Sequence, residues 1–585
     1  MAIKNQKTIN TTSPPKSTRE AIRLLHNMRH SFSPADFKLK ASVIQVLRHK
    51  HLSNAKGLIS YHEALCFMQA YPDNQVIGRL VDEELGNFAA RIEQYKKSHH
   101  KDTRLDDTGM VDTEIYYPYN HPMARWLSRN FGGEVEIDWA AYRQKENDPL
   151  LGLLPLFSLY AENDGIDDEE RGTVHWIKKA ANYGNKNTLR WLLDNLDHLK
   201  ISEEIRQYFY DNAELLLKWN LGQSMAARTL AKLPDGAIYY QKSLIKKSRI
   251  NLANSIRKSA PSIRIISGQS AAIIIETLTR ALLPRHRELY PLTYANPIEV
   301  YKITPGRGLE IYFIGMRPEN RLPLEADYSA LLIKNGVPIG YGISVVFFDR
   351  CEIALNIFDT FRSGEASFIF EQFVRVFYHH FGARNFLMRK YQVGDKNEEG
   401  IKSGAYWFYY KMGFRSLDPQ INKVAQDEWQ KIIKGKNYRT DSKTLKLLAR
   451  SDLHWAPLSR RKKPYYELAV TDLGYAVTDM IALKFGGDRT KALGWAVKRI
   501  KKALGSHLGG NLSKPESLQL EHFAPLLALI SNLENWSQKA KIKLAEIIRA
   551  KGGAKEIEYV KKLQKHQMLY DAFWEIAGRN LEANR

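Results

Sequence analysis

Residues 351–367 read CEIALNIFDTFRSGEAS, and this stretch decides how the middle of the chain is interpreted. Its first part, up to Phe358, is an apolar run of the kind that forms strands. The run breaks at Asp359, passes through a short turn that contains Gly364 and restarts as a helix. Such a turn is either a plain corner or a phosphate-binding turn, because a helix N-terminus presents unpaired backbone N–H groups.

Four strand-like runs lead up to this turn. They cover 308–316, 326–335, 338–349 and 350–358, and turn residues separate them. The dipeptide Asn335-Gly336 between two of these runs is a strong signal for a hairpin turn. We therefore expect an antiparallel meander.

Further elements follow the turn. We expect a helix from about Gly364 to Phe381, a fifth strand over 385–393 and a second helix over 405–412. The first of these helices allows the fourth and fifth strands to run parallel, because a parallel pair needs a crossover connection. The predicted centre of the molecule is a mixed β-sheet with helices.

The two flanks of this centre show helical periodicity. The predicted fold class is α+β, a central mixed sheet with large α-helical N-terminal and C-terminal regions. The expected parts are a disordered leader over 1–16, an α-helical domain over 17–265, a central domain over 270–420 and an α-helical C-terminal domain over 421–585. Such a long chain is too large for one compact core.

The composition limits the partners and the compartment. The chain carries 87 Lys and Arg against 64 Asp and Glu, a formal charge of +23, which favours an anionic partner such as tRNA or an acyl carrier protein, or simply reflects a basic surface. Only Cys66 and Cys351 are present, so we expect no disulfide framework and a cytoplasmic location. We expect no membrane span. His62-Glu63 does not continue as a HExxH metal motif, because residue 66 is Cys, and no metal site is predicted.

The run from about 308 to 416 resembles the GNAT (N-acetyltransferase-like) acyltransferase superfamily in the order and spacing of its motifs. Residues 364–366, Gly-Glu-Ala, match the second half of that family's pyrophosphate loop, Gln/Arg-x-x-Gly-x-Gly/Ala. Phe361 takes the place of the first Gln or Arg, and Arg362 comes one residue late. A later pattern, Ala-x-x-x-Tyr-x-x-x-Gly-Phe, is matched by Ala405, Tyr409, Gly413 and Phe414.

The resemblance implies a GNAT-like sheet and acetyl-CoA or another acyl-CoA as co-substrate. The pantetheine arm of the thioester donor would lie beside Ile357, Phe358 and Asp359. The pyrophosphate would be held by Arg362, Ser363, Gly364, Glu365, Ala366 and Ser367. Among these, the Glu365 carboxylate would repel an anion unless its side chain points away.

Two residues are candidates for acid–base chemistry. Acyl transfer to an amine needs a base for the amine proton and a proton for the departing thiolate. Glu352 is the candidate base, and the resemblance implies that Tyr409 is the proton donor. Alternatively, Glu352 is a strand residue that pairs with Arg350, and Tyr409 is a packed aromatic. Asp349 and Asp359 are reserve bases.

The sequence therefore predicts an acyltransferase that moves an acyl group from acyl-CoA, or from an acyl-carrier thioester, to an amine of an unknown acceptor. A transferase of the same fold that uses aminoacyl-tRNA is an alternative, because the charge of +23 suits that substrate. A GNAT-like binding or scaffold protein without catalysis is another alternative.

Overall fold

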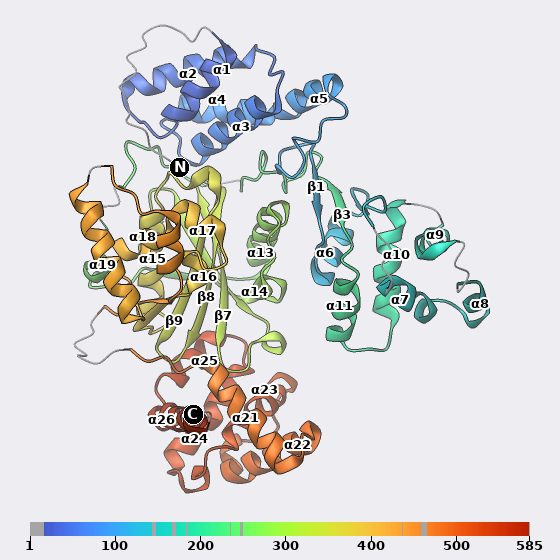
Figure 1. The fold of residues 1–585 in the computed structure, drawn as a ribbon, viewed down its shortest axis with the longest axis vertical. Coiled ribbons are helices and arrows are strands. Elements are labelled where there is room, and N and C mark those ends of the chain that lie inside the picture. The colour runs from blue at the N-terminus through green and yellow to red at the C-terminus, as the bar shows by residue number, and fades with distance from the viewer. Residues whose placement is uncertain are drawn as a thin grey trace.

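Figure 1 shows the computed structural model of the chain. It describes residues 17–142, 148–166, 171–182, 185–233, 236–245, 250–435, 437–457 and 465–583. The leader predicted over 1–16 lies outside the described residues. A large mixed sheet lies at the centre and helical regions flank it, so the α+β class and the helical flanks are confirmed.

The central sheet has nine strands among the described residues. Their order is β11 (Arg415–Ser416), β12 (Leu453–Trp455), β10 (Asn385–Met388), β9 (Arg350–Ile357), β8 (Val337–Phe347), β7 (Ala326–Lys334), β6 (Leu309–Met316), β5 (Ala295–Gly306) and β4 (Ile263–Ile266). Strands β9 and β10 run parallel, and the other neighbouring pairs run antiparallel.

The predicted meander is confirmed as β6, β7, β8 and β9, with bounds close to the expected runs. The turn between β7 and β8 is formed by Asn335, with φ of 48°, and Gly336, with φ of 82°. Positive φ at both central residues is the geometry that the Asn-Gly signal predicts. The parallel pairing of β9 with β10 is confirmed as well.

The sheet is wider than predicted, because β4, β5, β11 and β12 were not expected. Strand β5 contains Pro297 and Pro305, which disguise its pattern, and β12 has only three residues. Strand β4 lies within the segment predicted to be helical before residue 265, and β12 lies beyond residue 420. The fifth strand ends at Met388 instead of 393, because α16 (Lys390–Val393) begins there.

Two helices cover opposite faces of the sheet. Helix α15 (Ala366–His379) packs on one face, since a Cβ added to Gly342 would lie 2.6 Å from the ring of Phe373. Helix α13 (Gly268–Leu282) lies on the other side, against β5 and β8. Side chains alternate along a strand, so odd-numbered residues of β8 point away from α15.

The N-terminal flank has two parts (Figure 1). The first contains α1 (Thr18–Met28), α2 (Pro34–Arg48), α3 (Ala55–Ala70), α4 (Gln75–Gly86) and α5 (Phe88–Ser98). The second contains α6 (His121–Phe131), α7 (Pro149–Phe157), α8 (Asn163–Ile166), α9 (Gly172–Ala180), α10 (Asn185–His198) and α11 (Glu203–Asn212), and α12 (Leu252–Ser255) follows later.

The N-terminal flank, predicted as an α-helical domain, also contains a small sheet. Its second part also holds an antiparallel sheet in the order β1 (Glu114–Tyr117), β3 (Leu217–Asn220), β2 (Val135–Ile137). These strands have three or four residues each, which is too short for alternation to stand out from a helical background.

The hairpin turn of β7 and β8 anchors the N-terminal flank to the sheet. The Asn335 side chain donates to the carbonyl of Ala70 (2.8 Å) and accepts from the backbone N–H of Tyr239 (2.8 Å). The backbone N–H of Leu233 donates to the Gly336 carbonyl (2.8 Å). The end of α3 and the chain around residues 233–239 are therefore both tied to this one turn.

The C-terminal flank begins with α19 (Pro419–Lys434) and α20 (Ser442–Leu448). It continues with α21 (Val470–Phe485), α22 (Arg489–Leu504), α23 (Lys514–Leu527), α24 (Gln538–Lys551), α25 (Glu556–Leu563) and α26 (Gln567–Ala583). The last six helices gather below the sheet in Figure 1.

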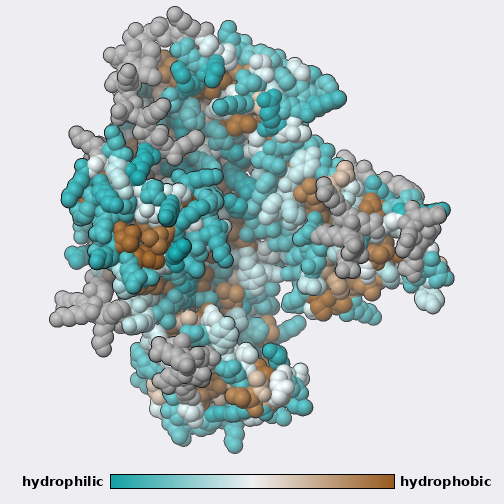
Figure 2. Space-filling view, viewed as in Figure 1, coloured by the Kyte–Doolittle hydropathy of each residue, from teal (hydrophilic) through white to brown (hydrophobic). Residues whose placement is uncertain are grey.

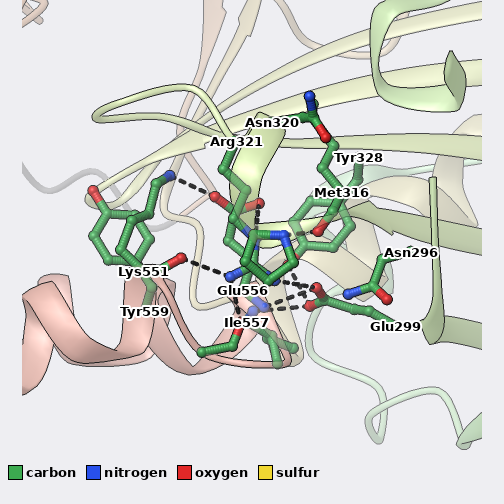
Figure 3. Close-up of polar contacts among 12 residues, drawn as sticks. Asn296, Glu299, Met316, Asn320, Arg321, Tyr328, Lys551, Glu556, Ile557 and Tyr559 are labelled. Carbon is green, nitrogen blue, oxygen red and sulfur yellow. Dashed lines mark hydrogen bonds and ion pairs between the residues drawn. The ribbon is translucent and has the colours of Figure 1, made fainter. Parts of the chain in front are cut away.

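A buried polar cluster joins these last helices to the sheet (Figure 3). Glu299 of β5 accepts hydrogen bonds from the Tyr328 hydroxyl (2.9 Å) and from the backbone N–H of Glu556 (2.8 Å). Arg321 donates to Glu299 (3.4 Å) and to the carbonyl of Lys551 (2.7 Å). The Lys551 ammonium pairs with Glu556. The charges of two cations, Arg321 and Lys551, are thus balanced by two carboxylates, Glu299 and Glu556. All four side chains are fully buried between the sheet and the C-terminal helices.

Hydrophobic side chains also reach the surface. Figure 2 shows brown areas over the lobe that contains α7 and α10, at the right of the view. Exposed large hydrophobic residues there include Leu151, Leu156, Leu159 and Tyr160. Among the described residues, no helix combines the length and the apolar character that crossing a membrane requires.

Candidate functional site

The turn quoted above closes against the N-terminal helices. A Cβ added to Gly364 would lie 2.5 Å from the hydroxyl oxygen of Tyr71, the residue that ends α3. Tyr71 therefore occupies the start of α15, where the sequence predicted a pyrophosphate, and the small size of Gly364 serves packing against Tyr71.

Glu365 points away from the turn into a buried ion cluster. Its carboxylate lies 2.8 Å from the Lys334 ammonium and 2.6 Å from the Arg307 guanidinium. It also accepts from the backbone N–H of Ile245 (3.1 Å). Burial alone would raise the pKa of Glu365, but Lys334 and Arg307 bring it below its usual value. The expected repulsion of an anion by Glu365 is thus cancelled by two cations.

A pocket of about 490 Å³ lies on the other side of the turn, and we call it the arginine pocket. Five arginines line it, namely Arg29, Arg228, Arg285, Arg287 and Arg362. They come from the residue that follows α1, from the loop after β3, from the segment after α13 and from the turn before α15. The fold therefore gathers cations from distant parts of the chain at the carboxyl end of β9.

Three carboxylates in the pocket pair with three of these arginines. Glu63 pairs with Arg228, and Asp359 lies 2.7 Å from the Arg362 guanidinium. Glu399 contacts Arg362 and lies 3.8 Å from Arg287. Burial would raise the pKa of Glu63, but Arg228 and His62 lower it to about 2, so this carboxylate is charged at neutral pH.

The two other arginines have no carboxylate partner among the described residues. Arg285 lies over the ring of Phe358 (3.9 Å) and donates only to the carbonyl of Ala281. Arg29 donates to the carbonyl of His26. Burial, and then the charge of Arg228, lower the pKa of Arg285 to about 9, so it remains a cation at pH 7.

Two buried polar atoms of the pocket residues also lack a hydrogen-bond partner in the structure. They are Nε of Arg228 and Nδ1 of His26. The rest of the Arg228 guanidinium is used, because it contacts Glu63 and donates to Thr360 (2.7 Å) and to the carbonyl of Thr108 (2.8 Å). Burial and the nearby Arg29 lower the pKa of His26, which keeps it neutral.

A half-exposed strip of the sheet runs from the arginine pocket along β8 and β9, on the face away from α15. We call it the open face. Its rows pair Tyr341 with Asn356, Ile343 with Ala354 and Val345 with Glu352, and all six residues are half-buried. Tyr341 and Asn356 line the pocket, and Glu352 lies at the other end. Asn356 lies four residues after Glu352, roughly 13 Å along β9.

Glu352 is held by arginines at this far end. It pairs with Arg389, which follows β10, and lies 3.5 Å from Arg350. Arg389 also contacts Asp452 (2.8 Å) and Glu467 (2.6 Å). The expected pairing of Glu352 with Arg350 is present. Its shorter contact is with Arg389, which the sequence did not indicate.

Asp327 is a candidate acid or base that the sequence reasoning missed. It lies in β7 in the same row as Val345 and Glu352. Burial, with the charges of Glu556 and nearby carboxylates, raises its pKa to about 8. Its Oδ1 atom is buried and has no hydrogen-bond partner in the structure. The available signal was an acidic residue inside the apolar run ADYSALLIK, on the face shared with Glu352.

Tyr409, in α18 (Ala405–Lys411), is not among the residues that line the pocket. Its ring packs against Phe370 of α15 and against Phe414, with centroids 5.5 and 6.0 Å away. Burial raises its pKa above the usual value, so the phenol keeps its proton. The predicted packing of this residue is present, and its role as a proton donor stays a prediction.

The structure brings only part of the predicted cofactor residues into the pocket. Phe358, Asp359 and Arg362 line it. Ile357, Ser363, Gly364, Glu365, Ala366 and Ser367 do not. Of the reserve bases, Asp359 is exposed and pairs with Arg362, while Asp349 accepts from the side chain of Asn385 (2.9 Å).

Strands β9 and β10 pair only over their first residues. The registered pairs are Asn385 with Arg350, Phe386 with Cys351 and Leu387 with Glu352. Beyond them β10 ends, and α17 (Glu398–Ser403) later brings Glu399 to the arginine pocket. Residues 353–357 of β9 therefore have no registered partner on the β10 side.

Comparison of the chain with protein-family models, with curated proteins and with solved structures finds no match in any of the three. The function must therefore be inferred from the geometry of the site itself.

Proposed function

We propose that the chain is an N-acyltransferase of GNAT type that moves an acyl group from acyl-CoA, or from an acyl-carrier thioester, to an amine. The observation that carries this proposal is the early end of the parallel pairing between β9 and β10, beside a cationic pocket. The pairing stops at Glu352 and Leu387, β10 ends at Met388, and the arginine pocket lies at the carboxyl end of β9.

The free edge of β9 supports a role in donor binding. The backbone N–H and C=O groups of residues 353–357 that face β10 have no strand partner there, and such groups favour hydrogen bonds to an amide-containing chain. The pantetheine arm of a thioester donor is such a chain. In this proposal its phosphates enter the arginine pocket, because Tyr71 occupies the helix end that the sequence suggested.

The open face supports the chemistry. The amine nitrogen attacks the thioester carbon, the C–S bond breaks, and the sulfur leaves as thiolate. Glu352, directly or through a water, accepts the proton that the amine loses, and the thiolate takes up a proton from an acid such as the Tyr409 phenol. Asp327, with a pKa of about 8, holds a proton at neutral pH and becomes a second candidate for the base as the pH approaches 8.

The first experiment tests donor binding with the full chain. Acetyl-CoA should raise the thermal unfolding midpoint, because a ligand that binds only the folded state stabilises it. The variant Ala354→Trp fills the middle of the open face and should lose this rise. Lys302→Trp, at a half-buried position of β5, is the control and should keep it. If neither acetyl-CoA nor CoA shifts the midpoint of the wild type, the proposal is wrong.

A second experiment tests catalysis. Thiol release from acetyl-CoA is measured with a panel of primary amines for the wild type, Glu352→Gln and Asp327→Asn. Loss of a general base should lower the rate by roughly 100-fold to 10,000-fold. Donor binding without thiol release for any acceptor would instead favour a binding or scaffold protein.

The charge of +23 favours one further candidate, a transferase that uses aminoacyl-tRNA as donor. Its affinity for tRNA should fall steeply with salt concentration, since each neutralised phosphate releases counterions. Transfer from charged tRNA without any response to acetyl-CoA would select this alternative.

A further inference from the structure

The arginine pocket carries an excess of positive charge that its own carboxylates do not balance. Five arginines face three carboxylates, and each of the three carboxylates is already paired. With His26 neutral, the difference of five and three leaves two positive charges. They belong to Arg29 and Arg285, the two arginines without a carboxylate partner among the described residues.

Such charges are costly to keep in the folded protein. A half-buried guanidinium without a counter-charge loses hydration and gains no ion pair in return. The lowered pKa values of Arg29 and Arg285, caused first by burial, agree with this cost. The ring of Phe358 under Arg285 offsets part of it. An anion bound in the pocket would supply the negative charge that Arg29 and Arg285 lack.

The hydrogen-bonding groups limit which anion fits. Arginine presents N–H donors in a planar fork that matches the oxygens of phosphate. Arg29 and Arg285 offer such forks. A phosphate monoester carries close to two negative charges at neutral pH and three oxygens, whereas a carboxylate or a phosphodiester carries one charge.

The size of the pocket limits the ligand as well. A volume of about 490 Å³ lies in the range of small-molecule sites. The apolar rings of Tyr341 and Phe358 line part of it, so the group attached to the phosphate has an aromatic wall to contact.

We propose that the arginine pocket is a binding site for a phosphate monoester, held by Arg29 and Arg285. This site extends the proposed function but does not depend on it. Under acyl transfer the phosphate belongs either to the donor, as the 3′-phosphate of CoA, or to a phosphorylated amine that accepts the acyl group. In both cases the phosphate joins the N-terminal helices to the turn before α15.

The test uses the full chain and calorimetric titration with inorganic phosphate and O-phosphoethanolamine. Arg29→Met and Arg285→Met should each weaken binding of the monoester at least tenfold. Arg384→Met is the matched control, because Arg384 also lies over a ring, that of Tyr378 (4.2 Å), but outside the pocket. Ethanolamine, which lacks the phosphate, should not compete.

A readout without ligand separates a binding role from a structural one. Removal of an unbalanced buried cation should leave the unfolding midpoint of Arg285→Met unchanged or raise it. A purely structural arginine would lower the midpoint when it is replaced. Wild-type protein that binds neither phosphate nor O-phosphoethanolamine nor CoA, or variants that bind them as the wild type does, would overturn the proposal.

The same variants identify the source of the phosphate. If Arg285→Met weakens CoA but leaves 3′-dephospho-CoA unchanged, the donor supplies the phosphate. If it weakens O-phosphoethanolamine and leaves CoA unchanged, the acceptor supplies it. If no thioester donor binds at all, the acyltransferase proposal fails while the titration with O-phosphoethanolamine still tests the phosphate site.

Discussion

The hydroxyl of Tyr71, the residue that follows α3, lies against Gly364, the residue directly before the N-cap of α15. A side chain from the N-terminal flank thereby takes the position in which a helix N-terminus would hold an anion. Gly364 is the residue that makes room for it, because a Cβ there would lie 2.5 Å from the Tyr71 oxygen.

We therefore predict that Gly364→Ala destabilises the fold by about 1 to 3 kcal/mol through overpacking against Tyr71. The double variant Tyr71→Leu/Gly364→Ala should show less loss than the sum of the two single variants. Unfolding in urea for all four proteins measures this coupling. Additive losses would contradict the contact, and a loss of ligand binding at unchanged stability would instead support a phosphate cradle at Gly364.

The hairpin turn of β7 and β8 predicts a second effect. Asn335→Ala removes three hydrogen bonds to the N-terminal flank and places alanine at a φ of 48°. We expect a loss of about 4 to 5 kcal/mol, the sum of roughly 1 kcal/mol for each bond and of the backbone strain. Asn335→Gly relieves the strain alone, so it should lose about 1 kcal/mol less. Equal stabilities of the two variants would contradict this division.

The cluster of Figure 3 predicts that Arg321 is needed for the junction between the sheet and the C-terminal helices. Arg321→Met leaves the buried Glu299 without its cation and should cost about 3 to 5 kcal/mol. Arg317→Met changes an exposed arginine nearby and serves as the control, with an expected change below about 0.5 kcal/mol. Thermal unfolding and trypsin cleavage after α20 report the result. A loss of the same size in both variants would argue against the cluster.

Asp327 predicts a dependence of stability on pH. Its pKa is raised to about 8 by burial, so the folded protein holds a proton that the unfolded chain releases above about pH 4. The wild type therefore loses stability as the pH rises from about 4 to about 8, and Asp327→Asn does not. The variant should gain about 4 kcal/mol over the wild type at pH 7 and nearly nothing at pH 4. A gain that does not change with pH would contradict the assignment.

Much of the sheet could be predicted because its central strands are long and their turn is specific. Strands β6 to β9 each have eight or more residues, and the Asn335-Gly336 turn has a distinctive chemistry. The outer strands were not predicted because their own sequences lack a clear strand pattern. Prolines interrupt β5, and β11 and β12 are so short that only their pairing with β10 and with each other defines them as strands.

The site was less predictable, because its lining comes from segments that no local pattern connects. Of the residues that the sequence suggested for the cofactor, Phe358, Asp359 and Arg362 line the pocket. Arg29 and Arg285 belong to none of the motifs found in the sequence. Their significance depends on an absent carboxylate neighbour, which only the three-dimensional arrangement of the described residues reveals.

The arginine pocket also has a consequence for synthesis of the protein. Its lining begins at His26 and ends at Glu399, so a ribosome has to release most of the chain before the pocket exists. N-terminal segments fold first during synthesis, at about 5 to 20 residues per second. Until then, Arg29 lacks the other pocket residues that surround it in the folded protein. A phosphorylated ligand would therefore bind only after the N-terminal helices of the nascent chain have packed against the sheet.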